Sequence, residues 1–480
     1  MQALLAPLRE LAGFDQMREK IQKNNGPFSV TGCVDSQKLH LIYGLSEQSR
    51  VKVIVTYSDL RLREIYEEYK FYDRNTFLYP AKDLIFFQAD IHGNQLTRER
   101  VRVLRRLSER KPVTLVTTFP ALMTPQVMWD EKQDIIRVER GGSLEEKSLA
   151  RRLVDLGYEK VYQVESQGQF SIRGGIVDIF DLTEENPYRI ELWGDEVESI
   201  RSFDILSQRS IEKLESISVY PATEFVLNED RIHKGLQKLE KEAAEREKLF
   251  RSEHLSEEAH RITSQVKELK EQLLEFRSTA NIEGYIRYFY ENDEEALEKA
   301  QEGKKTAPGR ITEKTAGAAD RVLTLPELMA AMTGVSPVFF FDEPARIYEQ
   351  ASAVELEFAE SMEQRALKGY VLPGQMKLLN SAETVTACIS RMPLCCVAAI
   401  DWKRPAVFNK VFGGREEKFE VSSRSISSYN NSFEALVKDL KRYKKTSSRV
   451  LLLSGSRTRA RRLAQDLRDE ELAAVYSEDP

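Results

Sequence analysis

Residues 32–39 read GCVDSQKL, which is in register with the phosphate-loop pattern G-x-x-x-x-G-K-[ST]. In that pattern the glycines let backbone amides converge on phosphates, the lysine reaches the β and γ oxygens, and the hydroxyl binds magnesium. Gly32 and Lys38 are in place, but Gln37 replaces the second glycine and Leu39 replaces the hydroxyl. A loop that kept its shape would strain Gln37 by about 1 kcal/mol or more. The residues therefore predict a degenerate phosphate loop.

Asp342 and Glu343 could belong to the same chemistry, because they directly follow the apolar run VFFF. In a working ATPase such a pair holds magnesium and lies near the attacking water. Asp35 in the loop would repel a bound polyanion, and DE pairs after strands are common by chance. We interpret these positions as a nucleotide site that has lost hydrolysis. A residual ATPase that uses Lys38, Asp342 and Glu343 is the alternative.

The segment YRIELW alternates in a way that suggests binding chemistry. In a strand, Ile190 and Leu192 would share one face, while Arg189, Glu191 and Trp193 would share the other. Arginine and tryptophan dominate the hot spots of protein interfaces. The pattern indicates a protein-binding face; the alternative is the solvated outer side of a half-buried sheet.

Arg173 ends the preceding apolar stretch, immediately before Gly174 and Gly175. A glycine pair inside a strand pattern predicts a β-bulge, which would redirect the arginine. Arg173 is therefore a candidate for the same protein-binding face.

A basic cluster near the C-terminus is a third candidate. Its members are Lys441, Arg442, Lys444, Lys445, Arg449, Arg457, Arg459, Arg461 and Arg462. No aromatic residues are interleaved with them, as a single-strand binder would require, and the net charge of the chain is −6. A solvated face or a contact to other domains explains the cluster, and DNA binding there or through Arg98–Arg110 remains an alternative.

Several classes of site are disfavoured by composition. The four cysteines stand in no CxxC motif and the five histidines are scattered, so we expect reduced thiols and no metal site. The N-terminus lacks the continuous apolar core of a secretory signal, and no apolar window of about 18 residues could span a membrane. We expect a cytoplasmic protein without a catalytic residue, metal or bound cofactor.

The elements that position these candidates begin with an α/β pattern. Val51–Thr56, Thr76–Tyr79 and Val113–Thr118 read as strands, with helices between them, which predicts a doubly wound sheet. Ser58 is the expected N-cap of a helix that buries Leu62, Ile65 and Tyr69. The helix Leu96–Arg110 should turn Val101, Leu104 and Leu107 to the core and its arginines to solvent.

From Asp134 the pattern changes to short alternating stretches: VYQVES, QFSIRG, GIVDIF, YRIELW and ESIRSF. They predict an antiparallel meander inserted into the α/β lobe. Lysine- and glutamate-rich helices follow, with Leu236, Leu239 and Ala243 on a buried face. Residues 301–319 read as a loop. Further on, RVLLLS at 449–454 reads as a buried strand and Val475-Tyr476 as the start of another. At 480 residues the chain should hold three or four domains. We place them at 1–133 and 222–355 (two parts of an NTPase-like lobe), 134–221 (the insertion) and 356–480 (a further α/β domain).

Several long motifs together carry a family resemblance. GQFSIRGGIVDIF, YRIELWGDEVESIRSFD, SQRSI and VYPATEF resemble the inserted domain shared by the excision-repair protein UvrB and the transcription-repair coupling factors (Mfd). The flanking TRERVRVLRRL, NIEGYIRYF and VFFFDEPARI fit in the same order. UvrB has a working phosphate loop and a long tyrosine-rich hairpin, whereas Tyr79–Gln95 is short here. KGYVLPGQMKLL and LLLSGSRTRARRLAQDL also look like the coupling factors, so the chain resembles their N-terminal part.

The resemblance implies a function and a fold. Coupling factors find RNA polymerase stalled at a lesion, displace it and recruit UvrA, and their UvrB-like N-terminal region docks on UvrA. By matching motif positions, Arg173, Arg189 and Trp193 would contact UvrA. The lobe would be a degenerate RecA-like NTPase fold, split by a mixed α+β insertion with an antiparallel sheet. RNA polymerase, DNA, ATP and magnesium would be bound by translocase and polymerase-interacting domains further C-terminal. That far C-terminal part is also expected to mask the docking surface.

Overall fold

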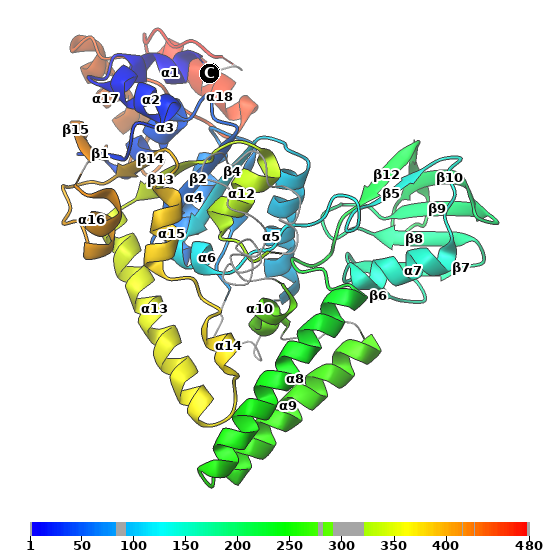
Figure 1. The fold of residues 1–480 in the computed structure, drawn as a ribbon. Coiled ribbons are helices and arrows are strands. Elements are labelled where there is room, and N and C mark those ends of the chain that lie inside the picture. The colour runs from blue at the N-terminus through cyan, green and yellow to red at the C-terminus, as the bar shows by residue number, and fades with distance from the viewer. Residues whose placement is uncertain are drawn as a thin grey trace.

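The main lobe is built on a seven-stranded sheet in which every described pair of strands is parallel (Figure 1). This computed structural model describes residues 2–82, 93–276, 282–290, 321–414, 416–426 and 428–477. The strand order is β15-β1-β14-β13-β2-β4-β3. The strands are β1 (Phe28–Thr31), β2 (Val51–Thr56), β3 (Thr76–Tyr79), β4 (Val113–Thr118), β13 (Val338–Asp342), β14 (Leu394–Val397) and β15 (Glu417–Glu420). The α/β prediction and the three strands expected from sequence are confirmed.

Helices cover both faces of this sheet, because its central strands are apolar on both sides. One face packs against α1 (Gln2–Arg9), α2 (Phe14–Lys23), α3 (Asp35–Leu45) and α4 (Asp59–Tyr69). The other packs against α5 (Gly93–Ser108), α6 (Phe119–Met123), α12 (Leu325–Thr333), α13 (Pro344–Leu367), α15 (Ala382–Ile389) and α16 (Ala406–Phe412). Ser58 caps α4 through a bond from the Arg61 amide, as expected.

The expected boundary between residues 355 and 356 does not separate two domains. It falls inside α13, and β14 lies between β1 and β13 in the main sheet. β15 forms the edge of the same sheet by pairing with β1. The prediction of a separate domain from residue 356 is therefore wrong for these strands, because β14 is apolar enough to be buried between two neighbours.

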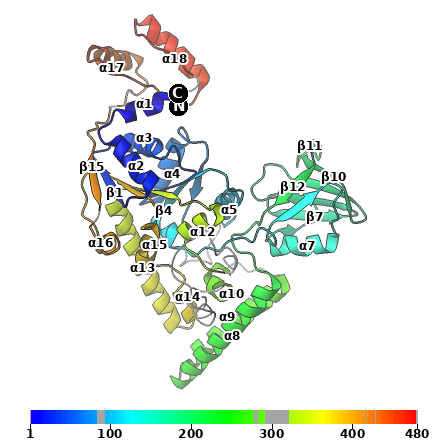
Figure 2. The ribbon, with the colours of Figure 1, turned by 45° about the horizontal axis from the view of Figure 1, so that its top comes forward.

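The inserted region forms a second, smaller sheet of order β11-β10-β9-β8-β7-β6. Its strands are β6 (Glu159–Lys160), β7 (Gln169–Arg173), β8 (Ile176–Phe180), β9 (Tyr188–Trp193), β10 (Glu196–Phe203) and β11 (Ser210–Leu214). The helix α7 (Glu146–Asp155) contacts β6 and β7. β5 (Ile136–Glu139) and β12 (Ser216–Val219) form a separate antiparallel pair where the chain enters and leaves. Both views show this region beside the main lobe, next to α5 (Figure 2).

Three details of the meander differ from the prediction. VYQVES forms no strand. The strand that precedes it, β6, ends at Lys160 and pairs with β7 in a parallel arrangement. β11 was not expected. Gly174 and Gly175 form no bulge: Arg173 pairs with Ile176, so they are the two-residue turn of the β7–β8 hairpin, with φ of +56° and +82°. Such turns need positive φ at both central residues, which glycine adopts without penalty.

Two long helices project from the lobe as an antiparallel pair (Figure 1): α8 (Glu229–Ser252) and α9 (Ser256–Phe276). Leu236, Leu239 and Ala243 are buried, as predicted. They share a core with α10 (Ile286–Phe289), with the C-terminal half of α13 and with residues around α14 (Pro373–Met376). The short 3-10 helix η2 (Ile282–Tyr285) precedes α10. The loop expected at 301–319 lies outside the described residues, as does most of the short segment after Tyr79.

The C-terminal part carries α17 (Phe433–Lys445) and α18 (Arg457–Asp469), which pack through a small apolar cluster. The buried strand predicted at 449–454 is wrong. Residues 450–453 are each 42–50% exposed and belong to no strand, because no described strand lies beside them to complete a ladder. Val475 and Tyr476 also form no strand. No helix among the described residues is both long and apolar enough to cross a membrane.

Candidate functional site

The outer face of the inserted sheet brings the predicted docking residues together. Ile190 is fully buried beneath β9, whereas Trp193 is 80% exposed, so the strand alternates as predicted. Arg189 donates two hydrogen bonds to Asp178, of 2.6 Å from Nε and 2.8 Å from Nη2. Arg173 donates to the same carboxylate at 3.2 Å. Two of the three residues therefore share one anchor.

Asp178 is the residue that sequence reasoning missed. It lies opposite Arg189 in the β8–β9 register, and its side chain is 3% exposed. Bidentate pairing fixes the plane of a guanidinium as well as its position. The hydrogen bonds that Arg189 donates to Asp178 are the first cause of a raised Arg189 pKa, so Arg189 stays charged. The sequence does contain a signal for this residue. Reading Gly174 and Gly175 as a hairpin turn sets the register of β7 against β8 and places Arg173 and Asp178 on one face.

A second ion pair occupies the neighbouring positions of the same face. Arg201 lies directly opposite Arg189 on β10, where two like charges would destabilise the sheet. Glu191 accepts a hydrogen bond from Arg201 and another from Ser199. Each arginine of the cross-strand pair thus has its own carboxylate, and the face is an ordered array of charges.

Replacing Asp178 should loosen both docking arginines. In Asp178→Asn the counter-charge is lost and only one acceptor oxygen remains for two guanidinium groups. We expect a loss of about 2 kcal/mol in the stability of the inserted domain, measured as amide hydrogen exchange in β8 and β9. Glu198→Gln is the control, since no hydrogen bond or ion pair between Glu198 and these arginines is seen among the described residues, and unchanged exchange in Asp178→Asn would contradict the anchoring role.

At the phosphate-loop position, no open loop exists. The helix α3 begins at Asp35, so Gln37, Lys38 and Leu39 are helical, and the expected strain at Gln37 does not arise. Leu39 is buried in the core. Only Gly32 adopts a positive φ, of +83°. The turn between β1 and α3 therefore consists of residues 32–34.

Two backbone amides of this turn are bonded within the chain. Gly32 N donates to the Ala399 carbonyl at 3.2 Å, and Val34 N donates to Ser423 Oγ at 2.9 Å. The segment after β15 lies over this turn: a Cβ on Gly32 would stand 1.9 Å from the Val421 carbonyl oxygen. These contacts occupy donors and space that a phosphate would need.

The side chains around Lys38 form a neutralised cluster. Lys38 is 2% exposed, and its Nζ lies 3.1 Å from Asp342 and 2.5 Å from Glu343. Burial lowers the Lys38 pKa, but Asp342 and Glu343 outweigh it and hold the pKa above its ordinary value. Arg61, on α4, donates to Asp342 at 3.2 Å. The structure thus brings together the predicted lysine and acidic pair, with a guanidinium against the aspartate.

Glu343 belongs to this cluster and adopts a strained, left-handed backbone conformation. Its φ is +60°, which costs a non-glycine residue of order 1 kcal/mol. Its amide donates to the Val397 carbonyl, and its Oε1 accepts from Ala399 N at 2.9 Å as well as from Lys38. The backbone of the loop after β14 therefore helps to fix the position of the acidic pair.

Arg100 corrects the expectation that the arginines of α5 face solvent. Its side chain is 1% exposed, donates from Nε to Glu224 at 2.8 Å, and stacks 4.0 Å from the centre of the Tyr79 ring. Lys82 lies 2.6 Å from the other Glu224 oxygen. Glu224 lies in the segment that leaves the inserted region, so this buried network joins the insertion to the main lobe.

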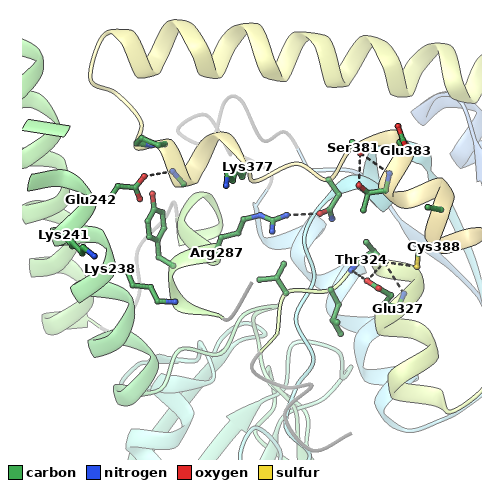
Figure 3. Close-up of a pocket in the computed structure, with 18 of the residues that line it drawn as sticks. Lys238, Lys241, Glu242, Arg287, Thr324, Glu327, Lys377, Ser381, Glu383 and Cys388 are labelled. Atoms are coloured by element: carbon green, nitrogen blue, oxygen red, sulfur yellow. Dashed lines mark hydrogen bonds between the residues drawn. The ribbon is translucent and has the colours of Figure 1, made fainter. Parts of the chain in front are cut away.

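A cleft of about 910 Å³ lies between α8, α10, α12 and α15 (Figure 3). Three of its polar residues bond within the protein: Glu242 accepts from Gly374 N, Glu327 accepts from the backbone amide of the N-cap Thr324, and Arg287 donates to Asn380. None of the residues predicted to bind a partner or a nucleotide lines it. Across the described residues, no group of three or more histidine, cysteine and acidic side chains could hold a metal ion.

Comparison with known proteins identifies the inserted region. Residues 136–225 match the model of the UvrB interaction domain. The chain is 28% identical over 415 residues to the transcription-repair-coupling factor of Bacillus subtilis (strain 168), a match that covers 85% of this chain and 31% of that protein. It is 32% identical over 209 residues to the coupling factor of Staphylococcus aureus (strain MRSA252), covering 42% and 18%.

The match to these relatives spans less than a third of their length. The docking residues Arg173, Arg189 and Trp193 all lie within the matched domain. The chain therefore carries a UvrB interaction domain and, over most of its length, is related to the N-terminal region of the transcription-repair coupling factors.

Proposed function

We propose that this chain acts in transcription-coupled nucleotide-excision repair as a UvrB-like module that recruits UvrA through the outer face of its inserted sheet. The observation that supports this most directly is the ordered pair of arginines, Arg173 and Arg189, on one buried aspartate within a UvrB interaction domain. Pre-ordered side chains lose little entropy on binding, which favours affinity. Trp193 adds an exposed aromatic ring of the kind found at the centres of interfaces.

The test is a titration of purified UvrA with the chain and its variants. In Arg189→Ala, the docking face loses a guanidinium that would contact the partner, and we expect binding at least thirtyfold weaker, as for an interface hot spot. Arg173→Glu, which reverses a charge, should have a similar effect. Arg151→Ala is the control, because Arg151 is exposed on α7, away from this face. UvrA binding that is unchanged when both docking arginines are replaced would refute the proposal.

We also propose that the main lobe is a degenerate RecA-like NTPase fold that does not hydrolyse ATP. The short turn at residues 32–34, the engaged amides at Gly32 and Val34, and the neutralised Lys38 support this reading. In a coupling factor of the length of its relatives, binding of ATP, magnesium, DNA and RNA polymerase would belong to the part not matched here. The far C-terminal part could also mask the docking face, in which case the chain alone should bind UvrA without activation.

A further inference from the structure

Tyr162 lies on the docking face although no strand pattern marked it. Its side chain is 83% exposed, and the guanidinium of Arg173 lies 5.6 Å from the centre of its ring. The hydroxyl of Ser171 donates to the Tyr162 carbonyl at 2.9 Å and ties this loop to β7. An exposed ring held beside a cation in this way is a ready contact surface.

Two exposed aromatic residues lie on either side of Arg173 across the sheet. Tyr162 precedes β7 and is beside the Arg173 guanidinium, whereas Trp193 is at the end of β9, two strands away. The β7–β8 turn and the end of β9 are joined, since the Leu192 amide donates to the Gly175 carbonyl at 2.7 Å. β7 and β9 are two strand spacings apart, about 10 Å. Ile176, half-buried on β8, forms the floor between them.

One cation of this face has room for a further anionic group. By register the described part of the face carries Arg173, Arg189, Arg201 and Lys213 together with the carboxylates Glu159, Asp178, Glu191 and Glu196, so the argument depends on how each arginine is engaged and not on an excess of positive charge. Asp178 is shared by two arginines. Because Arg173 is the less enclosed of the two, with its side chain 37% exposed against 14% for Arg189, it is the one placed to take a further acceptor.

We infer that Tyr162, Arg173 and Trp193 form a subsite for an acidic side chain of the docked protein. Its carboxylate pairs with the guanidinium of Arg173, and its methylene groups pack between the two rings on Ile176. This inference rests on the proposed function and assigns Tyr162 as a further contact residue of the UvrA-docking face. Desolvation by the rings would strengthen the ion pair compared with one in open water.

The experiment is a UvrA titration of Tyr162→Ala, Tyr162→Phe and Phe71→Ala at low and high salt. We expect about tenfold weaker binding for Tyr162→Ala, the typical cost of truncating a contacting aromatic. Tyr162→Phe should bind within twofold of the unchanged chain, since the ring and not the hydroxyl is used. Phe71→Ala, an exposed aromatic on the main lobe, is the matched control and should leave binding unchanged. The deficit of Tyr162→Ala should shrink at high salt as the ion pair is screened.

The outcomes separate the inference from the proposed function. If Arg189→Ala loses UvrA binding and Tyr162→Ala does not, the subsite is wrong while the docking face stands. If neither variant loses binding, the proposed function fails as well. Arginines beside exposed aromatic rings can also bind single-stranded DNA. A thymidine oligonucleotide is therefore titrated in parallel, and salt-dependent binding that Tyr162→Ala abolishes would overturn the assignment to a protein carboxylate.

Discussion

Arg100→Ala should destabilise the main lobe more than any other single change considered. The guanidinium is fully buried and bonds the Glu224 carboxylate, the Pro80 carbonyl and, at 3.5 Å, the Thr124 hydroxyl. Removing it leaves a buried carboxylate with only Lys82, and breaking such a pair costs about 3–5 kcal/mol. For a domain of this size we expect the melting temperature to fall by about 10 °C, measured by calorimetry.

The control for this change is on the same helix. Arg102→Ala removes a partly exposed arginine for which no ion pair is seen among the described residues, and it should shift the melting temperature by less than about 2 °C. Arg100→Lys tests the geometry: a point charge cannot reproduce the forked donors, so it should recover only part of the loss. Equal melting temperatures for Arg100→Ala and Arg102→Ala would show that the network is not stabilising.

The same network should respond to acid. Burial raises the Glu224 pKa, but Arg100 and Lys82 outweigh it and hold the pKa below its ordinary value. A carboxylate whose pKa is lowered on folding contributes stability above its unfolded pKa of about 4.3 and loses it as pH falls through the folded value. The difference in melting temperature between the unchanged chain and Arg100→Ala should therefore be constant from pH 8 to pH 5 and should narrow below about pH 4.

Lys38→Ala should be the second most damaging change, for stability and not for activity. The lysine is enclosed with Asp342, which is 1% exposed and would keep only Arg61 and Thr56. We expect a loss of about 3 kcal/mol in the free energy of unfolding. Because the Lys38 pKa is raised on folding, this contribution is complete below about pH 10.4 and is lost only as pH rises through the folded value.

Two further measurements decide what Lys38 does. Lys410→Ala, which removes an exposed pair with Glu383, is the matched control and should cost less than about 1 kcal/mol. The double variant Lys38→Met with Asp342→Leu should be less destabilised than the sum of the two single variants, since neither member of this pair is left without the other. Calorimetric titration with ATP and magnesium should show no heat. Heat that disappears in Lys38→Ala would instead establish a working nucleotide site.

The strands that could be predicted from sequence are those whose residues match their surroundings in a simple way. Val51–Thr56 and Val113–Thr118 are apolar on both sides, and YRIELW alternates cleanly. The cluster of Lys38 with the acidic pair also followed from its motif. β14 could not be assigned to this sheet from the sequence. Its neighbour β1 lies hundreds of residues earlier in the chain, and its neighbour β13 lies tens of residues earlier. Such pairings carry no local signal.

The residues that were missed act through tertiary partners. Arg100 shares a helix with several partly exposed arginines, and its buried partner Glu224 is 124 residues away in the chain. Asp178 reads as one polar residue in an apolar strand until the register places it opposite Arg189. The prediction of a buried strand at RVLLLS was wrong for the opposite reason. An apolar run becomes a buried strand only if another element covers it.

The order of strands in the main sheet has a consequence for how the protein is made. β1 is flanked by β14 and β15, so its first edge cannot pair until residue 397 has been synthesised, and its second edge not until residue 420. At about 5–20 residues per second, that delay is on the order of a minute or less. The inserted sheet is complete by residue 214. During synthesis the inserted domain can therefore fold first, while β1 of the main sheet stays unpaired until its partners β14 and β15 have been made.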